Sequence, residues 1–269
     1  MRSRLTVSSC RLFIPVGGGF VGLWLVVLMV FGASCQMDPC AGVSDKALER
    51  FRGSAKVEQL LSAMTLEDKV GEMTQLTLNM LCQGELSDKP GVHVVLYEPH
   101  ALDTSKLRIA FQERRIGSVL NCGGHAYPSA QWRELVSGIQ EASITAKGIP
   151  TLYGVDAIHG ATYTSGAALG PQQLALAATW DTSLVRKMAE ATAKEIQACG
   201  IPWNFAPVLD VGRDPRWPRF WETFGEDVKL VGDMGVAMVR GFQEGPVPVA
   251  ATLKHYVGYS MPWSGKDRT

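Results

Sequence analysis

Charged and aromatic side chains gather directly after several predicted strands of this sequence. Asp156 follows one hydrophobic stretch, the basic segment that ends at Arg219 follows the next, and Lys254 and His255 follow a third. The aromatic residues that accompany them along the chain are Tyr163, Trp217, Trp221 and Tyr256. Charged groups make strong directional hydrogen bonds, and flat rings cover the apolar face of a sugar. Asp156, Arg219, Lys254 and His255 are therefore candidate substrate-binding residues for a ligand rich in hydroxyl groups.

Each of these positions also has an ordinary structural explanation. Asp156 could form a turn or cap a helix, and the segment GRDPRWPR could be a solvated basic loop. Lys254 and His255 could mark a strand end that meets solvent. Glu226 and Asp227 are typical of acids in the first turn of a helix, where they favour the helix dipole. The convergence of three separate strand ends favours a shared binding site over these unrelated explanations.

Other classes of ligand fit the sequence poorly. A phosphate site would need glycine-rich amides with lysine, and a metal site would need histidine and carboxylate at coordination spacing. The sequence has neither pattern, and it has no CxxC pair. Basic and acidic residues are equal at 26 each, so no excess of positive charge is present to bind nucleic acid. We expect no metal, no cofactor and no nucleic-acid partner.

An alternation of strands and helices must position the candidate residues. The predicted strands are 117–120, 151–155, 201–208 and 247–253. The predicted helices are 131–147, 181–198 and 227–243, the last with Val228, Val231, Met238, Val239 and Phe242 on its inward face. Strand-then-helix steps of this kind imply right-handed βαβ units and a parallel sheet. The fold class is therefore α/β.

Two α/β architectures compete for this pattern, an open doubly wound sheet and a closed barrel. A nucleotide-binding open sheet should carry a glycine fingerprint after its first strand, and the turn NCGGH at 121–125 is not GxGxxG. Polar residues after several different strands are typical of a barrel, which gathers its active site at the carboxyl ends of the strands. We expect a (β/α)8 TIM-barrel-like fold that is incomplete, with about the first half of the barrel domain present.

Before this alternation the sequence predicts two helices, 56–64 and 65–78. Thr65 can cap the second helix, and Leu66, Val70, Met73 and Leu76 follow at helical spacing. The region 82–103 is rich in glycine and proline and is predicted to be a loop insertion around a short strand near 92–97.

The first 35 residues have the layout of a secretory signal. Arginines are the only charges among residues 1–11, and the densest apolar stretch, FVGLWLVVLMVF at 20–31, has 12 residues where a membrane span needs about 20. Small residues follow at 32–34, which suits a signal peptidase. The alternative is an uncleaved signal anchor, since residues 12–37 are uncharged. We expect a secreted protein that contacts no membrane beyond this leader.

An oxidising compartment would allow one or two disulfides, but the spacing of the cysteines does not predict which of them pair. The cysteines available after cleavage are Cys40, Cys82, Cys122 and Cys199, with Cys35 close to the cut.

Four long segments resemble glycoside hydrolase family 3. They are LSAMTLEDKVGEMTQ at 61–75, GIPTLYGVDAIHG at 148–160, the stretch from AATWD to FGED at 177–227, and VAATLKHYVGYS at 249–260. The resemblance implies that residues 36–269 are part of the family's N-terminal barrel domain. It also implies retaining hydrolysis of terminal non-reducing β-D-glucosyl residues, so a β-glucoside or β-glucan oligosaccharide is the expected substrate.

The resemblance also implies roles for individual residues. In such members the residues at the positions of Asp156, Arg219, Lys254 and His255 hold the non-reducing sugar. The nucleophilic Asp and the acid/base Glu of the family belong to positions beyond Thr269, so no catalytic residue is expected within this chain and the piece alone should be inactive. Many members have Gly where this chain has Pro218, and Pro restricts the backbone before Arg219.

Two alternatives remain open from the sequence. A β-xylosidase of the same family would have the same fold and act on a different sugar. A non-catalytic sugar-binding protein would bind a sugar at this site without hydrolysing it. N-acetylglucosaminide specificity is disfavoured, because such members carry a KHFPGHG-like loop where this chain has KHYVGYS. The sequence gives no indication of oligomeric state.

Overall fold

The fold is taken from a computed structural model that describes residues 54–86, 94–97, 100–122 and 124–268. The predicted leader, Cys35 and Cys40 lie outside these described residues. The chain divides into two compact units, residues 1–62 and 63–269, and the second contains the sheet. In the first unit the described structure is most of helix α3 (Ala55–Ala63), which confirms the helix predicted at 56–64.

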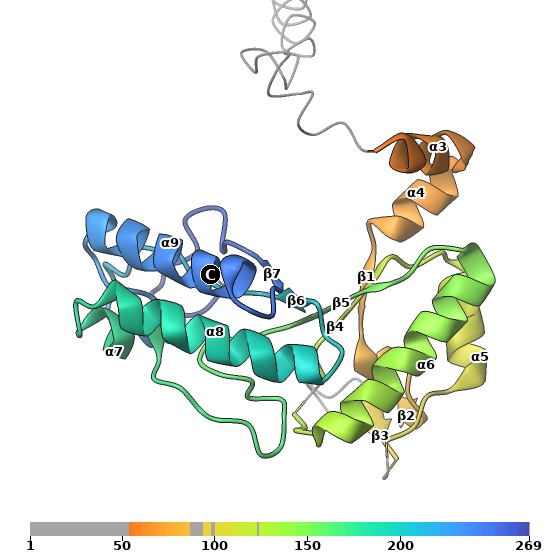
Figure 1. The fold of residues 1–269 in the computed structure, drawn as a ribbon, viewed down its shortest axis with the longest axis horizontal. Helices are drawn as coiled ribbons and strands as arrows, with labels where there is room; N and C mark the ends of the chain where they lie inside the picture. The colour runs from red at the N-terminus through yellow and green to blue at the C-terminus, as the bar shows by residue number, and fades with distance from the viewer. Residues whose placement is uncertain (1–53, 87–93, 98–99, 123, 269) are drawn as a thin grey trace, which may run out of the picture. The chain divides into compact units, whose positions relative to one another are not determined.

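The main sheet of the second unit has five parallel strands. They are β1 (Gln75–Thr77), β4 (Ser118–Leu120), β5 (Leu152–Val155), β6 (Trp203–Asn204) and β7 (Ala250–Ala251). Their order in the sheet, β1-β4-β5-β6-β7, follows their order in the chain (Figure 1). A doubly wound nucleotide-binding sheet would instead reverse its order at a switch point. The fold is thus α/β with a parallel sheet whose order is that of a TIM-barrel-like domain, as expected.

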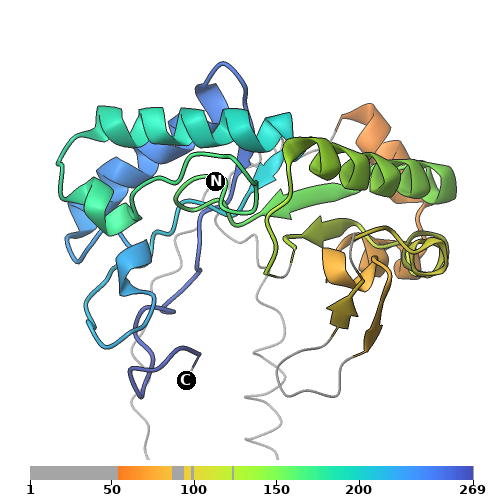
Figure 2. The same ribbon diagram turned by 90° about the horizontal axis from the view of Figure 1, so that it is seen from below.

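Three long helices connect the strands and share one hydrophobic core with the sheet. They are α6 (Ser129–Lys147), α8 (Thr182–Ala198) and α9 (Val228–Glu244). Figure 2 shows α6 and α8 running along the same side of the strands. Val119, Tyr153 and Val155 of the strands are buried in this core together with Trp132 of α6 and Phe242 of α9. One face of the sheet therefore depends on the helices for its burial.

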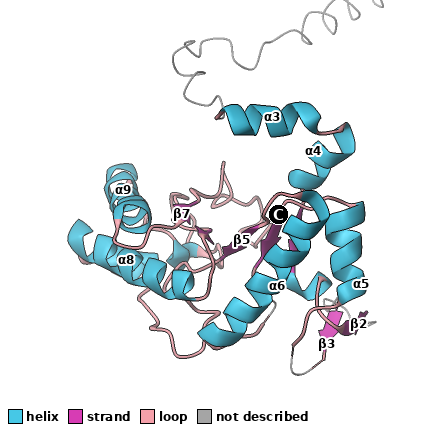
Figure 3. Ribbon diagram, turned by 45° about the vertical axis from the view of Figure 1, so that its right-hand side comes forward, coloured by secondary structure: helices cyan, strands magenta, loops and turns pink. Residues whose placement is uncertain are grey.

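The remaining elements are short. They are α4 (Leu66–Glu72), η1 (Leu78–Met80), β2 (Gly84–Leu86), β3 (Val94–Leu96), α5 (Thr104–Leu107), the π-helix η2 (Arg108–Glu113), α7 (Gln173–Ala177) and η3 (Phe220–Glu222). Strands β2 and β3 pair antiparallel in a separate sheet (Figure 3). The region predicted as an insertion around a single strand thus contains a hairpin.

The helix ends follow from local sequence. Thr65 and Asp68 form a capping box, since the Thr65 side chain accepts from the Asp68 amide and Asp68 accepts from the Thr65 amide. Asp181 caps α8 and Asp227 caps α9 in the same way, each accepting from a backbone amide of the first turn. Gly148 ends α6 with φ of 70°, a left-handed conformation that favours glycine. The three predicted helices 131–147, 181–198 and 227–243 are confirmed within two residues at each end.

The helix predicted at 65–78 is wrong in its second half. It ends at Glu72, and residues 75–77 form β1, which pairs with β4. Leu66, Val70 and Met73 are exposed rather than packed. The Gly117 amide donates to the Gly71 carbonyl at 3.0 Å, so tertiary pairing replaces the helical turn.

Strands β6 and β7 are also shorter than predicted. Each has two residues, where the sequence suggested 201–208 and 247–253. Pro202, Pro207 and Pro248 lie within the predicted strands and lack the amide donor that a sheet ladder needs. On α9 the predicted inward position Val228, the first residue of the helix, is exposed.

Cys82, Cys122 and Cys199 are buried free thiols, so no disulfide joins them to one another. Burial raises the pKa of Cys82 to about 11 and that of Cys122 to about 12. Within the described ranges, no helix combines the length and apolar character needed to cross a bilayer.

Two glycines of α9 give a matched test of the α8–α9 packing. A Cβ on Gly241 would lie 2.5 Å from the Arg186 carbonyl oxygen and 2.6 Å from the Ala189 Cβ, both on α8, whereas a Cβ on Gly232 would meet nothing within 4 Å. We expect Gly241→Ala to destabilise the protein by about 1–3 kcal/mol through overpacking. Gly232→Ala should stabilise it by up to about 1 kcal/mol because alanine is the better helix former. Urea denaturation of both variants measures the difference, and equal effects would contradict the close approach of the two helices.

Candidate functional site

The centre of the candidate site is an ion pair between two strand ends. Asp156 directly follows β5, and Lys254 follows β7, where it forms a parallel bridge with Val208. The Lys254 Nζ donates to the Asp156 Oδ1 at 2.5 Å. The Lys254 side chain is 12% exposed and that of Asp156 is 31% exposed, so the pair is largely buried but reachable from solvent. Two residues that are 98 positions apart in the sequence thereby become direct partners.

Asp156 has a second partner that sequence reasoning treated only as part of a turn. Asn121 follows β4, and its Nδ2 donates to the Asp156 Oδ2 at 2.7 Å. The Asn121 Oδ1 accepts from the Asp156 backbone amide at 2.8 Å. The signal in the sequence was a single polar residue immediately after a buried strand.

His255 is held by a buried carboxylate. The Asp210 Oδ2 lies 2.7 Å from the His255 Nδ1 and also accepts from the His255 backbone amide at 3.0 Å. The Asp210 side chain is 2% exposed, whereas that of His255 is 27% exposed. Because an ionised carboxylate can only accept hydrogen bonds, the Nδ1 of His255 carries a proton. The Nε2 is then the ring nitrogen left to face a ligand.

Arg219 is fixed by Glu222 of η3. The Arg219 Nε donates to Oε1 of Glu222 at 2.9 Å, and Nη2 donates to Oε2 at 2.6 Å. This hydrogen bonding raises the pKa of Arg219 further above its ordinary value, so the guanidinium stays charged. Its Nη1 donates to the Tyr259 Oη at 3.3 Å, and its Cζ lies 5.4 Å from the centre of the Tyr259 ring. Glu222, which the sequence left without a role, thus orients Arg219.

The four candidate residues form two contact groups that are joined by one peptide bond. Asp156 pairs with Lys254, while Arg219 and His255 line a common hollow of about 560 Å³ with Tyr259. The His255 and Tyr259 rings have centroids 4.6 Å apart. Asp156 is not among the residues that line this hollow. Lys254 and His255 are consecutive, so they connect the two groups at the carboxyl ends of the strands.

The aromatic partners differ from those expected. Tyr256 also lines the hollow but is 99% exposed, and Tyr259 is the ring that contacts His255. Trp217 is buried in edge contact with Tyr259 and does not face a ligand. Burial, and after it the charge of the Asp156 carboxylate, raises the pKa of the Tyr163 hydroxyl.

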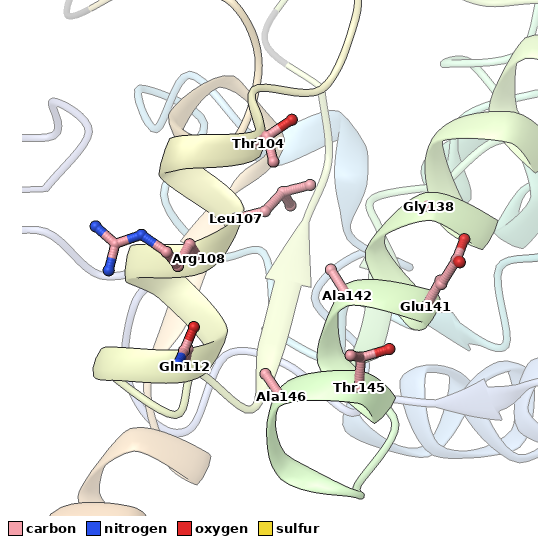
Figure 4. Close-up of a pocket in the computed structure, with 9 residues that line it drawn as sticks. All are labelled: Thr104, Leu107, Arg108, Gln112, Gly138, Glu141, Ala142, Thr145 and Ala146. Carbon is pink, nitrogen blue, oxygen red and sulfur yellow. The ribbon is translucent and has the colours of Figure 1, made fainter.

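A second hollow, of about 510 Å³, shares no residue with this site. It lies between α5 with η2 and helix α6, and Figure 4 shows Thr104, Leu107, Arg108 and Gln112 on one side of it. The other side is formed by residues of α6, from Gly138 to Ala146. In the part of the chain with assigned positions, no three His, Cys, Asp or Glu side chains gather as metal ligands would.

Comparison with known proteins identifies the relatives of this chain. The family model described as the glycosyl hydrolase family 3 N terminal domain matches residues 65–269. The lysosomal beta glucosidase of Dictyostelium discoideum is 38% identical over 234 residues, which cover 79% of this chain and 27% of the relative. A beta-xylosidase of Formosa agariphila is 40% identical over 123 residues, covering 42% of this chain and 17% of the relative.

Among solved structures, the exo-1,3/1,4-beta-glucanase of a Pseudoalteromonas species is similar to this chain. It has a TM-score of 0.65 and 33% sequence identity, and the match covers 80% of this chain and 26% of that one. The chain therefore spans only about a quarter of the length of the glucosidase and the glucanase that it matches.

The Asp210 contact predicts the tautomer of the neutral His255 ring. We expect nitrogen-15 NMR of the protein that contains this chain to find the His255 proton on Nδ1. In Asp210→Ala the acceptor is gone, so the proton should distribute over both ring nitrogens. Asp210→Asn keeps one oxygen that can accept both bonds and should retain the Nδ1 proton. His159, whose Nδ1 lies 3.2 Å from the Gly170 carbonyl oxygen, serves as internal reference. An unchanged His255 spectrum in Asp210→Ala would contradict the proposed fixation.

Proposed function

This chain belongs to glycoside hydrolase family 3, and we propose that the protein containing it hydrolyses terminal non-reducing β-D-glucosyl residues with retention of configuration. We further propose that Asp156, Arg219, Lys254 and His255 bind the non-reducing sugar. The observation that carries this proposal is the Asp156–Lys254 pair, which joins the ends of β5 and β7 next to the His255 and Arg219 hollow. The expected substrates are β-glucosides and β-glucan oligosaccharides.

The hydrogen-bonding capacity of this cluster suits a sugar. Each oxygen of an ionised carboxylate has two lone pairs, and each oxygen of Asp156 accepts one side-chain hydrogen bond within the protein. One lone pair on each oxygen can therefore accept from vicinal hydroxyl groups. The Nζ of Lys254 can donate to further sugar hydroxyl groups, and the unprotonated Nε2 of the neutral His255 ring can accept from one. Tyr259 adds a flat ring beside His255, although its edge contacts with Trp217 and His255 restrict which part of the ring a sugar can reach.

We assign this cluster to substrate binding. Retaining hydrolysis requires a nucleophilic carboxylate and an acid/base carboxyl group, and we assign neither role to a residue of the cluster. Asp156 is paired with Lys254, Glu222 is bound through both oxygens to Arg219, and Asp210 accepts two hydrogen bonds from His255. A nucleophile needs a carboxylate that is open to the anomeric carbon. Glu222 and Asp210 are engaged in orienting Arg219 and His255, and Asp156 is held by Lys254 and Asn121 to accept from hydroxyl groups.

A β-xylosidase is the second candidate function, favoured by the 40% identity to the Formosa agariphila enzyme. Xylose lacks the hydroxymethyl group of glucose, so the two functions differ in the contacts made around that group. The ratio of kcat/KM for an aryl β-glucoside to that for an aryl β-xyloside separates them. A protein that binds glucose and turns over neither substrate would instead be a non-catalytic sugar-binding protein.

We expect Asp156→Ala to lower kcat/KM for an aryl β-glucoside by about a hundredfold or more. A binding group whose contacts tighten in the transition state contributes a few kcal/mol to transition-state stabilisation, so its loss lowers the rate of turnover. The matched control is Asp233→Ala, which removes an exposed carboxylate on α9 whose partner is Lys229, also exposed. The control should have the kinetics of the parent. Equal kinetics for the parent and Asp156→Ala would refute the assignment.

We also propose that residues 1–35, which precede the described structure, direct the chain into the secretory pathway. The support is the arginine-flanked apolar stretch of the sequence. Amino-terminal sequencing of the protein recovered from its native source should find a start near residue 35. An intact Met1 terminus on a membrane-bound product would support the signal anchor, and an intact terminus on an intracellular product would refute the leader.

A further inference from the structure

We propose that Asn121 is a positioning residue whose neutral side-chain amide sets the orientation of the Asp156 carboxylate and adds no charge beside it. The kinetic part of this inference rests on the proposed function, because it assigns Asn121 a role in presenting Asp156 to the sugar. The structural part rests only on contacts within the chain.

The Asn121 amide contacts the same residue at two places. Its Oδ1 accepts from the Asp156 backbone amide at 2.8 Å, and its Nδ2 donates to the Asp156 Oδ2 at 2.7 Å. The first contact fixes the backbone where the chain leaves β5, and the second fixes the rotation of the carboxylate. A carboxylate held at its backbone and at one oxygen can present the remaining lone pairs in a single direction.

Asn121 can do this because β5 holds Asn121 in turn. Its backbone amide donates to the Gly154 carbonyl at 3.0 Å, and its own carbonyl accepts from the Tyr153 Oη at 2.7 Å. Tyr153 is fully buried, so its hydroxyl is a fixed anchor. Asn121 has φ of 47°, and asparagine is one of the few residues besides glycine that adopts this left-handed region readily. The amide is therefore mounted on the rigid sheet.

The charges around Asp156 explain why this position needs an amide. Lys254, which follows β7, donates to the Asp156 carboxylate, and the Tyr163 hydroxyl in the loop after β5 lies close enough for the carboxylate to raise its pKa. Burial and the Asp156 charge keep the Tyr163 hydroxyl protonated, so Lys254 is the group that balances the carboxylate. Asn121 adds a donor without adding a charge. An aspartate there would place a carboxylate oxygen where the Nδ2 now donates, and two carboxylates at that distance cannot both ionise readily.

Substituting Asn121 by Asp therefore gives a pH-dependent test. When the pair of carboxyl groups shares one proton, the protonated oxygen can replace the Nδ2 donor and restore the contact. When the proton is lost, the two anions repel each other. The raised pKa belongs to the folded state, so the stability of Asn121→Asp relative to the parent is retained at low pH and is lost as pH rises through that pKa.

The first arm measures kcat/KM for an aryl β-glucoside in the protein that contains this chain, from about pH 4 to pH 7.5, a range that spans carboxyl titration. We expect Asn121→Asp to be at least about tenfold below the parent at neutral pH and to approach it at the acidic end. Leucine has a similar size to asparagine and no hydrogen-bond donor. The kcat/KM of Asn121→Leu should therefore lie below that of the parent by the same factor at every pH. A constant ratio for Asn121→Asp across this range would overturn the positioning role.

The second arm measures the thermal midpoint of the same proteins over the same pH range and does not depend on catalysis. The gap between Asn121→Asp and the parent should widen as pH rises, while the gap for Asn121→Leu should stay constant. A widening gap combined with a constant kinetic ratio would mean that the contact is only structural, and the proposal would fail. A parent that turns over neither glycoside would refute the proposed function, and the melting arm would then still decide whether a neutral side chain is required beside the Asp156 carboxylate.

Discussion

The candidate site depends on the ion pair between Asp156 and Lys254. Its two residues leave strands β5 and β7, which are separated in the sheet by β6. Removing two charges from water is costly, and a largely buried pair is favourable only when further hydrogen bonds satisfy both partners. For Asp156 these come from Asn121, which follows β4. Residues at the ends of three strands thus surround one carboxylate. Because all of these contacts must form together, the ends of β4, β5 and β7 must lie close to one another.

The rest of the site is built by the same principle, with one polar residue orienting another. Asp210 holds His255, and Glu222 holds Arg219 through two hydrogen bonds. In each case the orienting residue is the less exposed of the two side chains. Binding groups whose rotamers are fixed in advance lose less entropy when a ligand arrives, so such pairs favour both affinity and specificity. The loops that carry Arg219 and His255 contribute to function through these supports as well as through their own side chains.

Much of the fold could be predicted from local sequence. The ends of α6, α8 and α9 follow from caps at Asp181 and Asp227 and from Gly148, because capping involves residues only a few positions apart. The failures are where distant segments compete with local preference. Residues 75–77 join a strand although they continue a helical pattern, and the prolines near β6 and β7 shorten strands that hydrophobicity alone would extend. In the site, the types of residue at the strand ends were predictable, whereas the pairing of Asn121 with Asp156 and the contact of Tyr259 with His255 were not.

The sequence by itself determined the alternation of strands and helices, the polar residues that follow the strands, and the membership in a glycosidase family. Periodicity, capping and long motifs are local properties, so they can be read along the chain. The tertiary structure alone decided which polar residues become partners. Lys254 meets Asp156 across 98 positions, and Asp210 meets His255 across 45, because parallel strands bring their carboxyl ends to the same edge of the sheet. Hydrogen bonds extend over about 3 Å and depend on direction, and only the folded backbone sets distances and directions on that scale.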